Sequence, residues 1–449
     1  MEKEYDFDML LALLEQKDYR ALRAALAEEK EVDIADFIEE VPEDKAVVVF
    51  RSLPKVLAAE VFSNLPPEQQ QLIINAFTDA ELSAIVEELY VDDAVDMLEE
   101  LPANVVKRVL KNAHPDTRKL INQFLNYPEN SVGSIMTAEF MDLKKTMTVE
   151  DAIKHIRRTG EDSEMIYTCY VTDAGRRLEG VVTVRELLVA RDDQLVADLM
   201  ETDLITAETT EDREEAVSQM MKYDFITMPV VDREQRLVGI VTVDDVMDVM
   251  EEEATEDFEK MAAMAPSEKP YLKTSTFSLA KHRIMWLLIL MISGMITGGI
   301  LGHYEAAFAT MPLLVTFIPM LTDTGGNAGS QSSTLIIRGM AVGEIELGDF
   351  FKVFWKELRV SILVGVVLSA VNFVRLLITY PGNLVMALTV SLTLIVTVML
   401  AKTVGGLLPM IAKICHADPA IMAAPLITTI VDAISLVVYF NIAEALLRV

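Results

Sequence analysis

The chain has 449 residues, with 70 acidic and 39 basic side chains and a formal net charge of −31. This length exceeds what one hydrophobic core supports, so several domains are expected. The strong negative charge argues against nucleic acid as a partner, because its phosphates would be repelled. Two cysteines, Cys169 and Cys415, fit a reducing compartment and argue against a disulfide-built scaffold.

The charge is unevenly distributed along the chain. Residues 1–283 contain 61 of the 70 acidic residues and 31 of the 39 basic ones, and the remainder is nearly neutral and strongly apolar. This pattern predicts an acidic soluble part followed by a membrane part. An acidic part of this kind suits the binding of metal cations, or simply solubility.

Residues 1–130 contain a repeat of 12 residues. Its clearest mark is a proline preceded by Val or Leu, which occurs at Pro42, Pro54, Pro66 and Pro102. Each unit reads as a short helix and a turn, and one of them, "TDAELSAIVEEL", carries the spacing of a helix-capping box. Such helices bury little surface alone, so we expect them to stack into a small superhelix.

Residues 131–198 and 199–250 form a second, longer repeat. The segment "VTDAGRRLEGVVTVRELL" aligns with "VVDREQRLVGIVTVDDVM", and each copy predicts a helix, two short strands and a further helix. The pattern resembles a pair of CBS domains, which are regulatory modules.

An acidic segment leads from this module to the first apolar stretch, and we expect a connecting helix over 251–275. Nine of the 16 residues in 244–259 are acidic and none is basic. Like charges four apart, such as Asp248 and Glu252, destabilise a helix by roughly 0.2–0.5 kcal/mol per pair. The run therefore favours a bound cation, although a solvated linker is the usual fate of such a sequence.

Five apolar stretches follow, at 284–302, 308–335, 358–379, 384–411 and 419–447. Each is long enough for the roughly 20 residues that cross a bilayer. The fold class predicted is therefore multidomain: an all-α superhelix, an α+β CBS pair, an acidic helix and a five-span helical membrane domain over 276–449. The excess of Lys and Arg at one set of ends places the N-terminal domains in the cytoplasm.

Two of the stretches carry polar residues at membrane depth. The second, "TDTGGNAGSQSST", has glycines that weaken a helix and side chains that require protein or water around them. Close packing of small residues is the alternative explanation. The fifth has an isolated carboxylate, Asp432, which suggests a cation site or a hydrogen bond to a neighbouring helix. Lys402 has no evident role, since a cation facing a pore would oppose conduction; it either snorkels or pairs.

No motif for an enzyme is visible. The chain lacks GxxxxGK[ST], HExxH and GxSxG, and its five histidines are scattered. Oxygen ligands dominate, which favours hard ions such as Mg²⁺, Ca²⁺ or Mn²⁺.

Taken in this order, the parts resemble the MgtE family of bacterial magnesium channels over essentially the whole chain. The most specific motifs are "TGGNAGSQSSTLIIRG" and "DPAIMAAPLITTIVDAISL". The resemblance implies a homodimer in the inner membrane, with a pore between the subunits in which Asp432 holds a largely hydrated Mg²⁺. The residues expected to line this pore are Gly325, Gly326, Asn327, Thr428 and Asp432.

The resemblance also implies that cytosolic Mg²⁺ closes the pore by binding at acidic interfaces. The implied ligands are Glu60, Asp92, Asp96, Glu214, Asp224, Asp245, Asp248, Glu253, Glu256, Asp257 and Asp418. Some members bind ATP between the CBS domains, for which Arg185 and Phe225 are the candidates here. Two other classes stay open: a coupled exporter of divalent cations, for which Asp323 is the only second titratable group at membrane depth, and a CBS-regulated membrane enzyme.

Overall fold

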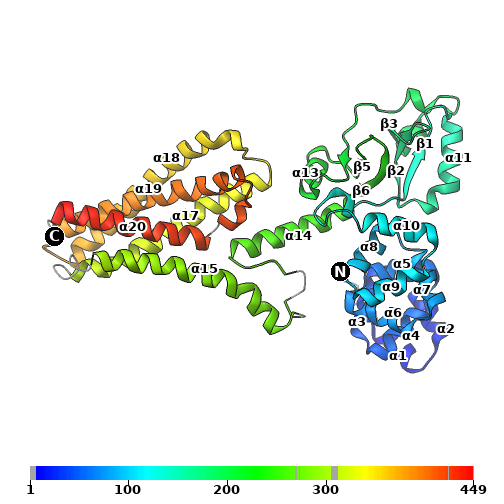
Figure 1. Cartoon of the computed structure of the whole chain (residues 1–449), viewed down its shortest axis with the longest axis horizontal. Coiled ribbons are helices and arrows are strands. Elements are labelled where there is room, and N and C mark those ends of the chain that lie inside the picture. The colour runs from blue at the N-terminus through cyan, green and yellow to red at the C-terminus, as the bar shows by residue number, and fades with distance from the viewer. Residues whose placement is uncertain (1–6, 268–270, 273, 305–311, 423, 448–449) are drawn as a thin grey trace. The chain divides into compact units, whose positions relative to one another are not determined.

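The computed structural model describes residues 7–267, 271–272, 274–304, 312–422 and 424–447. The chain divides into two compact units, residues 1–250 and 251–449, and each is described here by itself (Figure 1). The first unit contains the superhelix and both CBS domains. The second contains the end of the acidic helix and all the long apolar helices.

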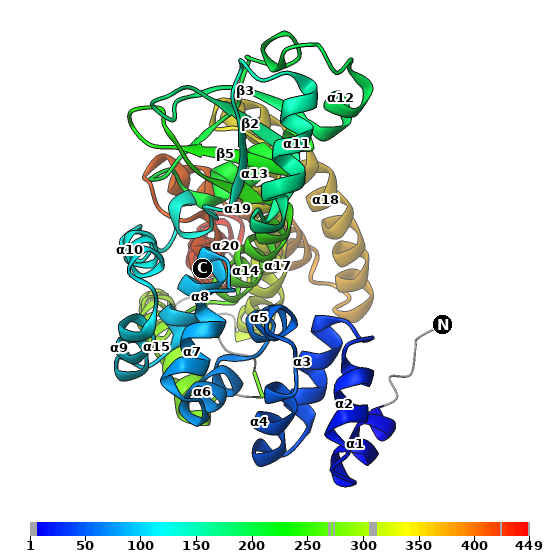
Figure 2. The ribbon, with the colours of Figure 1, turned by 90° about the vertical axis from the view of Figure 1, so that its right-hand side faces the viewer.

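Ten short helices make up the superhelix, as the 12-residue repeat predicts (Figure 2). Each proline of the repeat is an N-cap whose carbonyl accepts a hydrogen bond from the amide four residues on, as Pro54 does from Ala58 at 2.8 Å. A proline suits this position because it has no N–H to satisfy. The helices are α1 Phe7–Glu15, α2 Tyr19–Leu26, α3 Glu31–Glu40, α4 Glu43–Arg51, α5 Lys55–Ser63, α6 Pro67–Ala76, α7 Asp79–Val86, α8 Val91–Glu100, α9 Ala103–Asn112 and α10 Pro115–Phe124.

The predicted capping box is present at the start of α7. The Thr78 hydroxyl accepts a hydrogen bond from the Glu81 amide, and the Glu81 carboxylate accepts one from the Thr78 amide. The buried faces of the short helices merge into one hydrophobic core, which continues into the second CBS domain through residues such as Phe124, Val132 and Val246. The superhelix and the CBS pair are therefore packed as one body.

The two CBS copies have the same topology, which confirms the internal repeat. In each three-stranded sheet the first two strands are parallel and the last two antiparallel, and the first strand of each was not anticipated from the sequence. The Tyr170 hydroxyl donates a buried 2.7 Å hydrogen bond to Thr227 of the other copy. The elements are β1 Phe140–Leu143, α11 Val149–Thr159, β2 Met165–Thr172, β3 Leu178–Thr183, α12 Val184–Val189, then β4 Ala207–Glu208, α13 Arg213–Tyr223, β5 Thr227–Val231 and β6 Leu237–Thr242.

The acidic helix α14 has different bounds from those predicted. It runs over Val243–Met261, so it begins as the last helix of the second CBS domain and ends well before residue 275. Val246 and Val249 are buried, which ties its first turns to the core of the first unit. This burial explains how the acidic sequence holds a helix there despite its like-charge neighbours.

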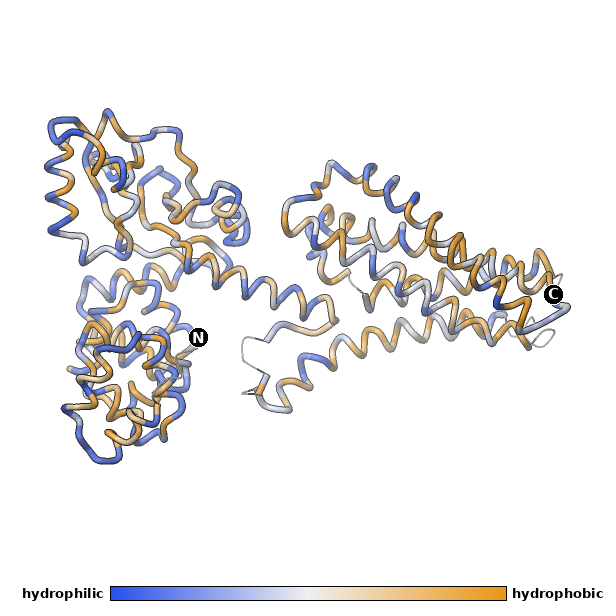
Figure 3. Tube along the Cα trace, turned by 180° about the vertical axis from the view of Figure 1, so that it is seen from behind, coloured by the Kyte–Doolittle hydropathy of each residue, from blue (hydrophilic) through white to orange (hydrophobic). Residues whose placement is uncertain are grey.

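The second unit is a bundle of long helices, apolar along most of their length (Figure 3). Among the residues that the structure describes, four regions are long and apolar enough to cross a membrane: 276–303, 347–379, 384–414 and 419–447. The polar residues of α17 keep it out of this group, although it packs against both α19 and α20. The helices are α15 Thr276–His303, α17 Ile318–Ala341, α18 Phe350–Thr379, α19 Leu384–Ile414 and α20 Ala424–Leu447, with a short 3-10 turn, η6 Pro419–Met422, before α20.

The glycines of α17 do not interrupt it, contrary to the sequence-based expectation. The helix is continuous over 24 residues. A side chain at Gly325 would place its Cβ 2.7 Å from Thr397 of α19, and one at Gly329 would lie 2.7 Å from Ile427 of α20. The glycines therefore allow close helix packing, which outweighs their low helix propensity. The first residues of the stretch predicted over 308–335 lie outside the described residues.

Candidate metal sites and ion path

Three carboxylates meet in the first unit. One oxygen from each of Asp92, Glu164 and Asp245 lies within 4.8 Å of the others. They come from the superhelix, the first CBS domain and the start of α14, so their approach depends on the packing of all three parts. The arrangement is one that a divalent cation can bridge, since Mg²⁺ and Ca²⁺ prefer carboxylate oxygens.

Local structure fixes each of these side chains. Asp92 lies in the first turn of α8, is only 7% exposed, and accepts a 3.0 Å hydrogen bond from the amide of its neighbour Asp93. Asp245 lies in the first turn of α14 and accepts a 2.5 Å hydrogen bond from the Thr242 hydroxyl. Glu164 directly precedes β2, and its Oε2 is buried with no hydrogen-bond partner among the described residues.

The negative charges of these three carboxylates repel one another and so oppose their close approach. Burial raises the pKa of Asp92 well above its usual value, and the carboxylates of Glu164 and Asp245 raise that pKa further. The pKa of Glu164 is raised for the same reasons. Burial, helped by Asp244, raises the pKa of Asp93 and of Asp245 to about 6. A cation at this place would relieve both the repulsion and the unpaired Glu164 oxygen, so the residues fit a bound Mg²⁺.

Sequence reasoning named two members of this cluster and missed the third. Asp92 and Asp245, both named as ligands through the resemblance, lie together in this cluster. Glu164 is 72 positions from Asp92 and belongs to no motif, so only the folded topology reveals it. The other candidates of the first unit are exposed and lie outside this three-residue group: Glu60, Asp96, Glu214, Asp224 and Asp248. Asp224 ends α13 in a left-handed conformation with a φ of 54°.

The candidates of the second unit gather around a lysine. Lys260 of α14 forms ion pairs with Glu256 and, at 2.6 Å, with Asp418. Asp418 also accepts a hydrogen bond from the Ala420 amide and so begins the η6 turn. Burial and the nearby Asp418 raise the pKa of Asp257. Glu253 lies one turn earlier on the same helix and contributes to that shift.

Lys260 directly follows the acidic run at 244–259. The sequence predicted that a cation should neutralise this run, and Lys260 supplies part of that positive charge from within the chain. Burial opposes the charge on Lys260, but its hydrogen bonds to Asp418 and Glu256 outweigh that effect and raise its pKa. The end of α14 is thereby held to the turn that precedes α20.

Asp432 lies on α20 beside the polar helix α17. It is half-buried, and no hydrogen bond or ion pair to it is present in the described part of the chain. Its electrostatic neighbour is Asp323 of α17, which is exposed, as is Asn327 one turn further on. Gly325 and Gly326 are buried instead, and a Cβ at Gly326 would lie 2.9 Å from Thr428. The two glycines thus set the distance between α17 and α20, while Asp323, Asn327 and Asp432 supply polar atoms.

The two nucleotide candidates are not joined by any interaction among the described residues. Arg185 is exposed on α12 of the first CBS domain. Phe225 follows α13 of the second and stacks on Tyr223, with ring centroids 5.6 Å apart.

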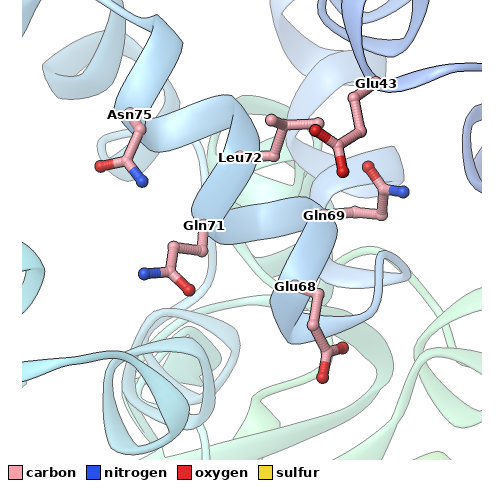
Figure 4. Close-up of a pocket in the computed structure, with 6 residues that line it drawn as sticks. All are labelled: Glu43, Glu68, Gln69, Gln71, Leu72 and Asn75. Carbon is pink, nitrogen blue, oxygen red and sulfur yellow. The ribbon is translucent and has the colours of Figure 1, made fainter. Parts of the chain in front are cut away.

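One hollow of about 210 Å³ lies on the superhelix, between α4 and α6 (Figure 4). Its lining has two carboxylates, three amides and one leucine: Glu43, Glu68, Gln69, Gln71, Leu72 and Asn75. No residue predicted to bind a metal or nucleotide borders it. The hollow therefore offers no support for a site there.

The structure thus combines a CBS pair, a carboxylate cluster and a bundle of long apolar helices that carries the half-buried Asp432, the makeup of a membrane transporter of cations. Comparison with known proteins agrees. A family model described as a divalent cation transporter matches residues 318–442, one described as the MgtE intracellular N domain matches residues 29–130, and CBS-domain matches cover 132–193 and 196–252. The chain belongs to the MgtE family.

One relative covers almost the full length of the chain, and two others cover more than half of it. The magnesium transporter MgtE of Thermus thermophilus is 38% identical over 438 residues, 97% of each chain. The magnesium transporter MgtE of Bacillus subtilis is 35% identical over 73% of this chain and 72% of its own. The crystal structure of the cytosolic domain of the Mg²⁺ channel MgtE in complex with ATP is 39% identical, covers 54% of this chain and 98% of its own, and has a TM-score of 0.51. These relatives are named as transporters or channels, not as enzymes.

Proposed function

We propose that this protein is a Mg²⁺ channel that admits the ion to the cytoplasm down its electrochemical gradient. The observation that carries the proposal is the half-buried Asp432, which lies beside the polar face of α17 and has no hydrogen bond or ion pair within the described part of the chain. Mg²⁺ gives up its water reluctantly, so one or two carboxylates and polar oxygens that contact its hydration shell suit it better than a closed cage. A divalent ion gains roughly 4.6 kcal/mol on entering through 100 mV, at about 2.3 kcal/mol per charge, so no coupling reaction is needed.

The polar face of α17 also supports a homodimer. Asp323 and Asn327 are one helical turn apart and exposed in the single chain. Polar side chains at membrane depth are tolerated only against protein or water. A second copy facing the first would enclose a water-filled path between two Asp432 side chains. The site of action is then the cytoplasmic membrane, with the acidic domains in the cytoplasm.

Cytosolic Mg²⁺ closes this channel in our proposal, by binding at the cluster of Asp92, Glu164 and Asp245. In its absence the three carboxylates repel one another, and the superhelix loosens from the CBS pair. ATP at the CBS pair is a second proposed ligand. It is supported by the ATP-bound structure of the related cytosolic domain, with Arg185 and Phe225 as the residues to test.

The proposal is tested by Mg²⁺ uptake into liposomes that contain the purified protein, with a membrane potential but no proton or Na⁺ gradient. Asp432→Asn and Asp432→Ala should both abolish uptake, because the charge is required. The matched control is Glu444→Gln, which removes an exposed carboxylate from the same helix and should leave uptake unchanged. Wild-type uptake that required an ion gradient would favour the coupled exporter and overturn the channel.

A further inference from the structure

Two opposite charges are buried in the membrane bundle. Lys402 of α19 is 5% exposed and Glu357 of α18 is 9% exposed. The Lys402 side chain is enclosed by the helices of the bundle. Of the two roles that the sequence left open, this burial favours pairing over snorkelling, and the charge of Lys402 is compensated inside the bundle.

A serine of α17 connects the two charges. The Lys402 ammonium lies 3.4 Å from the Ser332 Oγ and 3.4 Å from the Gln331 Oε1, and the Ser332 hydroxyl donates a 2.5 Å hydrogen bond to the Glu357 carboxylate. The Ser332 hydroxyl thus accepts a hydrogen bond from the Lys402 ammonium and donates one to the Glu357 carboxylate. Each of these two hydrogen bonds strengthens the other. Three helices, α17, α18 and α19, meet at this one chain of contacts.

Glycines shape the space around the chain of contacts. Gly406 lies one turn after Lys402, and a Cβ there would lie 2.9 Å from the Glu357 Cγ, so the glycine makes room for the glutamate. Gly405 approaches the backbone of Gly329 so closely that a Cβ would lie 2.2 Å from its carbonyl oxygen. The two glycines therefore let α19 approach the Glu357 side chain and the backbone of α17 closely.

Ser332 also lies opposite the polar face of α17. It is nine residues from Asp323, which at 100° per residue places the two about 180° apart around the helix. The burial agrees, since Ser332 is 1% exposed and Asp323 is exposed. A hydrogen-bonded anchor on the back of α17 fixes the rotation of the helix about its own axis. That rotation determines which residues stand beside Asp432.

We propose that Lys402, Ser332 and Glu357 are positioning residues for the ion path: their buried charged chain of contacts holds α17 so that Asp323 and Asn327 face the path. The inference rests on the proposed channel function. Removing one charge leaves the other buried and unpaired, which favours rotation or separation of α17. Removing both leaves no buried charge, and the glycine packing then holds the helix in place.

The test measures the orientation of α17 directly. Asn327→Cys is introduced into a Cys415→Ser background, and its reaction rate with a water-soluble thiol reagent is recorded in the full-length protein in liposomes. Lys402→Met and Glu357→Gln should each lower this rate at least tenfold and weaken the preference for Mg²⁺ over Ca²⁺ in uptake. The double variant Lys402→Met/Glu357→Gln should recover to within about threefold of the parent. Lys413→Met, which removes an exposed lysine from the same helix, is the control and should change neither value.

Single variants that melt at lower temperature but keep the parent's labelling rate and ion preference would show that the pair only stabilises the bundle, and would overturn the proposal. So would a double variant no better than the singles, or an Asn327→Cys that fails to react in the parent. If a single variant does not fold, the double variant and Lys402→Arg decide the question. Failure of the wild-type protein, in which Asn327 is intact, to take up Mg²⁺ would refute the channel function alone, since the labelling rates do not depend on transport.

Discussion

At the scale of single residues, Glu164 is the strongest indication that the cluster of Asp92, Glu164 and Asp245 is a metal site and not a chance grouping of acids. The carboxylates that raise the pKa of Glu164 come from α8 and α14, and only a hydrogen bond from Thr137 lowers it: the four acids are Asp92, Asp93, Asp244 and Asp245. Its Oε2 has no hydrogen-bond partner among the described residues. Without a cation, these carboxylates are most easily buried when protonated.

The raised pKa values of these carboxyls predict that the stability of this region depends on pH. A carboxyl whose folded pKa is raised contributes stability that is full below its unfolded pKa and is lost as pH rises through the folded pKa. For Asp93 and Asp245 the loss falls between 3.8 and about 6, and the raised pKa of Glu164 extends it upward. In the metal-free protein, amides of α8 should therefore exchange hydrogen faster at pH 8 than at pH 5, after correction for intrinsic rates.

Glu164→Gln should flatten the upper part of this profile and raise the Mg²⁺ concentration needed to protect α8, because it removes both a repulsive charge and a ligand. Glu161→Gln, an exposed change in the same segment, is the control. Saturating Mg²⁺ should abolish the pH dependence of the wild type. A Glu164→Gln protein with an unchanged Mg²⁺ requirement would exclude this carboxylate as a ligand.

At the scale of elements, the packing of α17 depends on glycines placed where its neighbours approach most closely. Gly405→Ala should destabilise the bundle by about 1–3 kcal/mol, the usual range for overpacking a core, because its Cβ would collide with the Gly329 carbonyl. Gly365→Ala is the matched control: it also faces α19, but its Cβ would lie 3.4 Å from Ile395. The measurement is thermal unfolding in detergent, and equal melting temperatures for the two variants would contradict the packing argument.

The sequence predicted elements well where one local rule determines them. Proline N-caps and the Thr78 capping box placed the short helices, and the repeat placed both CBS copies. The sequence-based prediction failed where packing outweighed helix propensity. The glycines of α17 indicated a broken helix, which the structure shows to be continuous. The acids of α14 gave no indication that its first turns are buried at Val246. Asp92 and Asp245 could be named through the resemblance to the MgtE family, but Glu164 could not, because it belongs to no motif and nothing local distinguishes it from other glutamates.

At the scale of the whole molecule, α14 is the element that connects the N-terminal domains to the second unit along the chain. It begins in the first unit and ends in the second. Asp245 belongs to the carboxylate cluster at one end, and Lys260 pairs with Asp418 at the other. A ligand shifts a two-state equilibrium only by its preference for one state, and a change from 1:99 to 99:1 requires about 5.5 kcal/mol. In the proposed gating, a single exposed site is too weak to provide this free energy, so several sites along α14 are expected to act together.

Replacement of the five acids along α14 with their amides should therefore remove the response to Mg²⁺. The five are Asp245, Asp248, Glu253, Glu256 and Asp257. In the wild type, Mg²⁺ should protect residues 7–267 from protease and close the channel over the same concentration range. In the variant, neither the digestion rate nor the current should depend on Mg²⁺, because repulsion and ligands are removed together. The control replaces five exposed acids of the superhelix: Glu28, Glu39, Glu40, Glu43 and Asp44. If the variant kept the wild-type Mg²⁺ dependence in both measurements, the acids of α14 would have no role in gating and the acidic run would be a solvated linker. The Lys260–Asp418 pair alone would then hold the end of α14 in place.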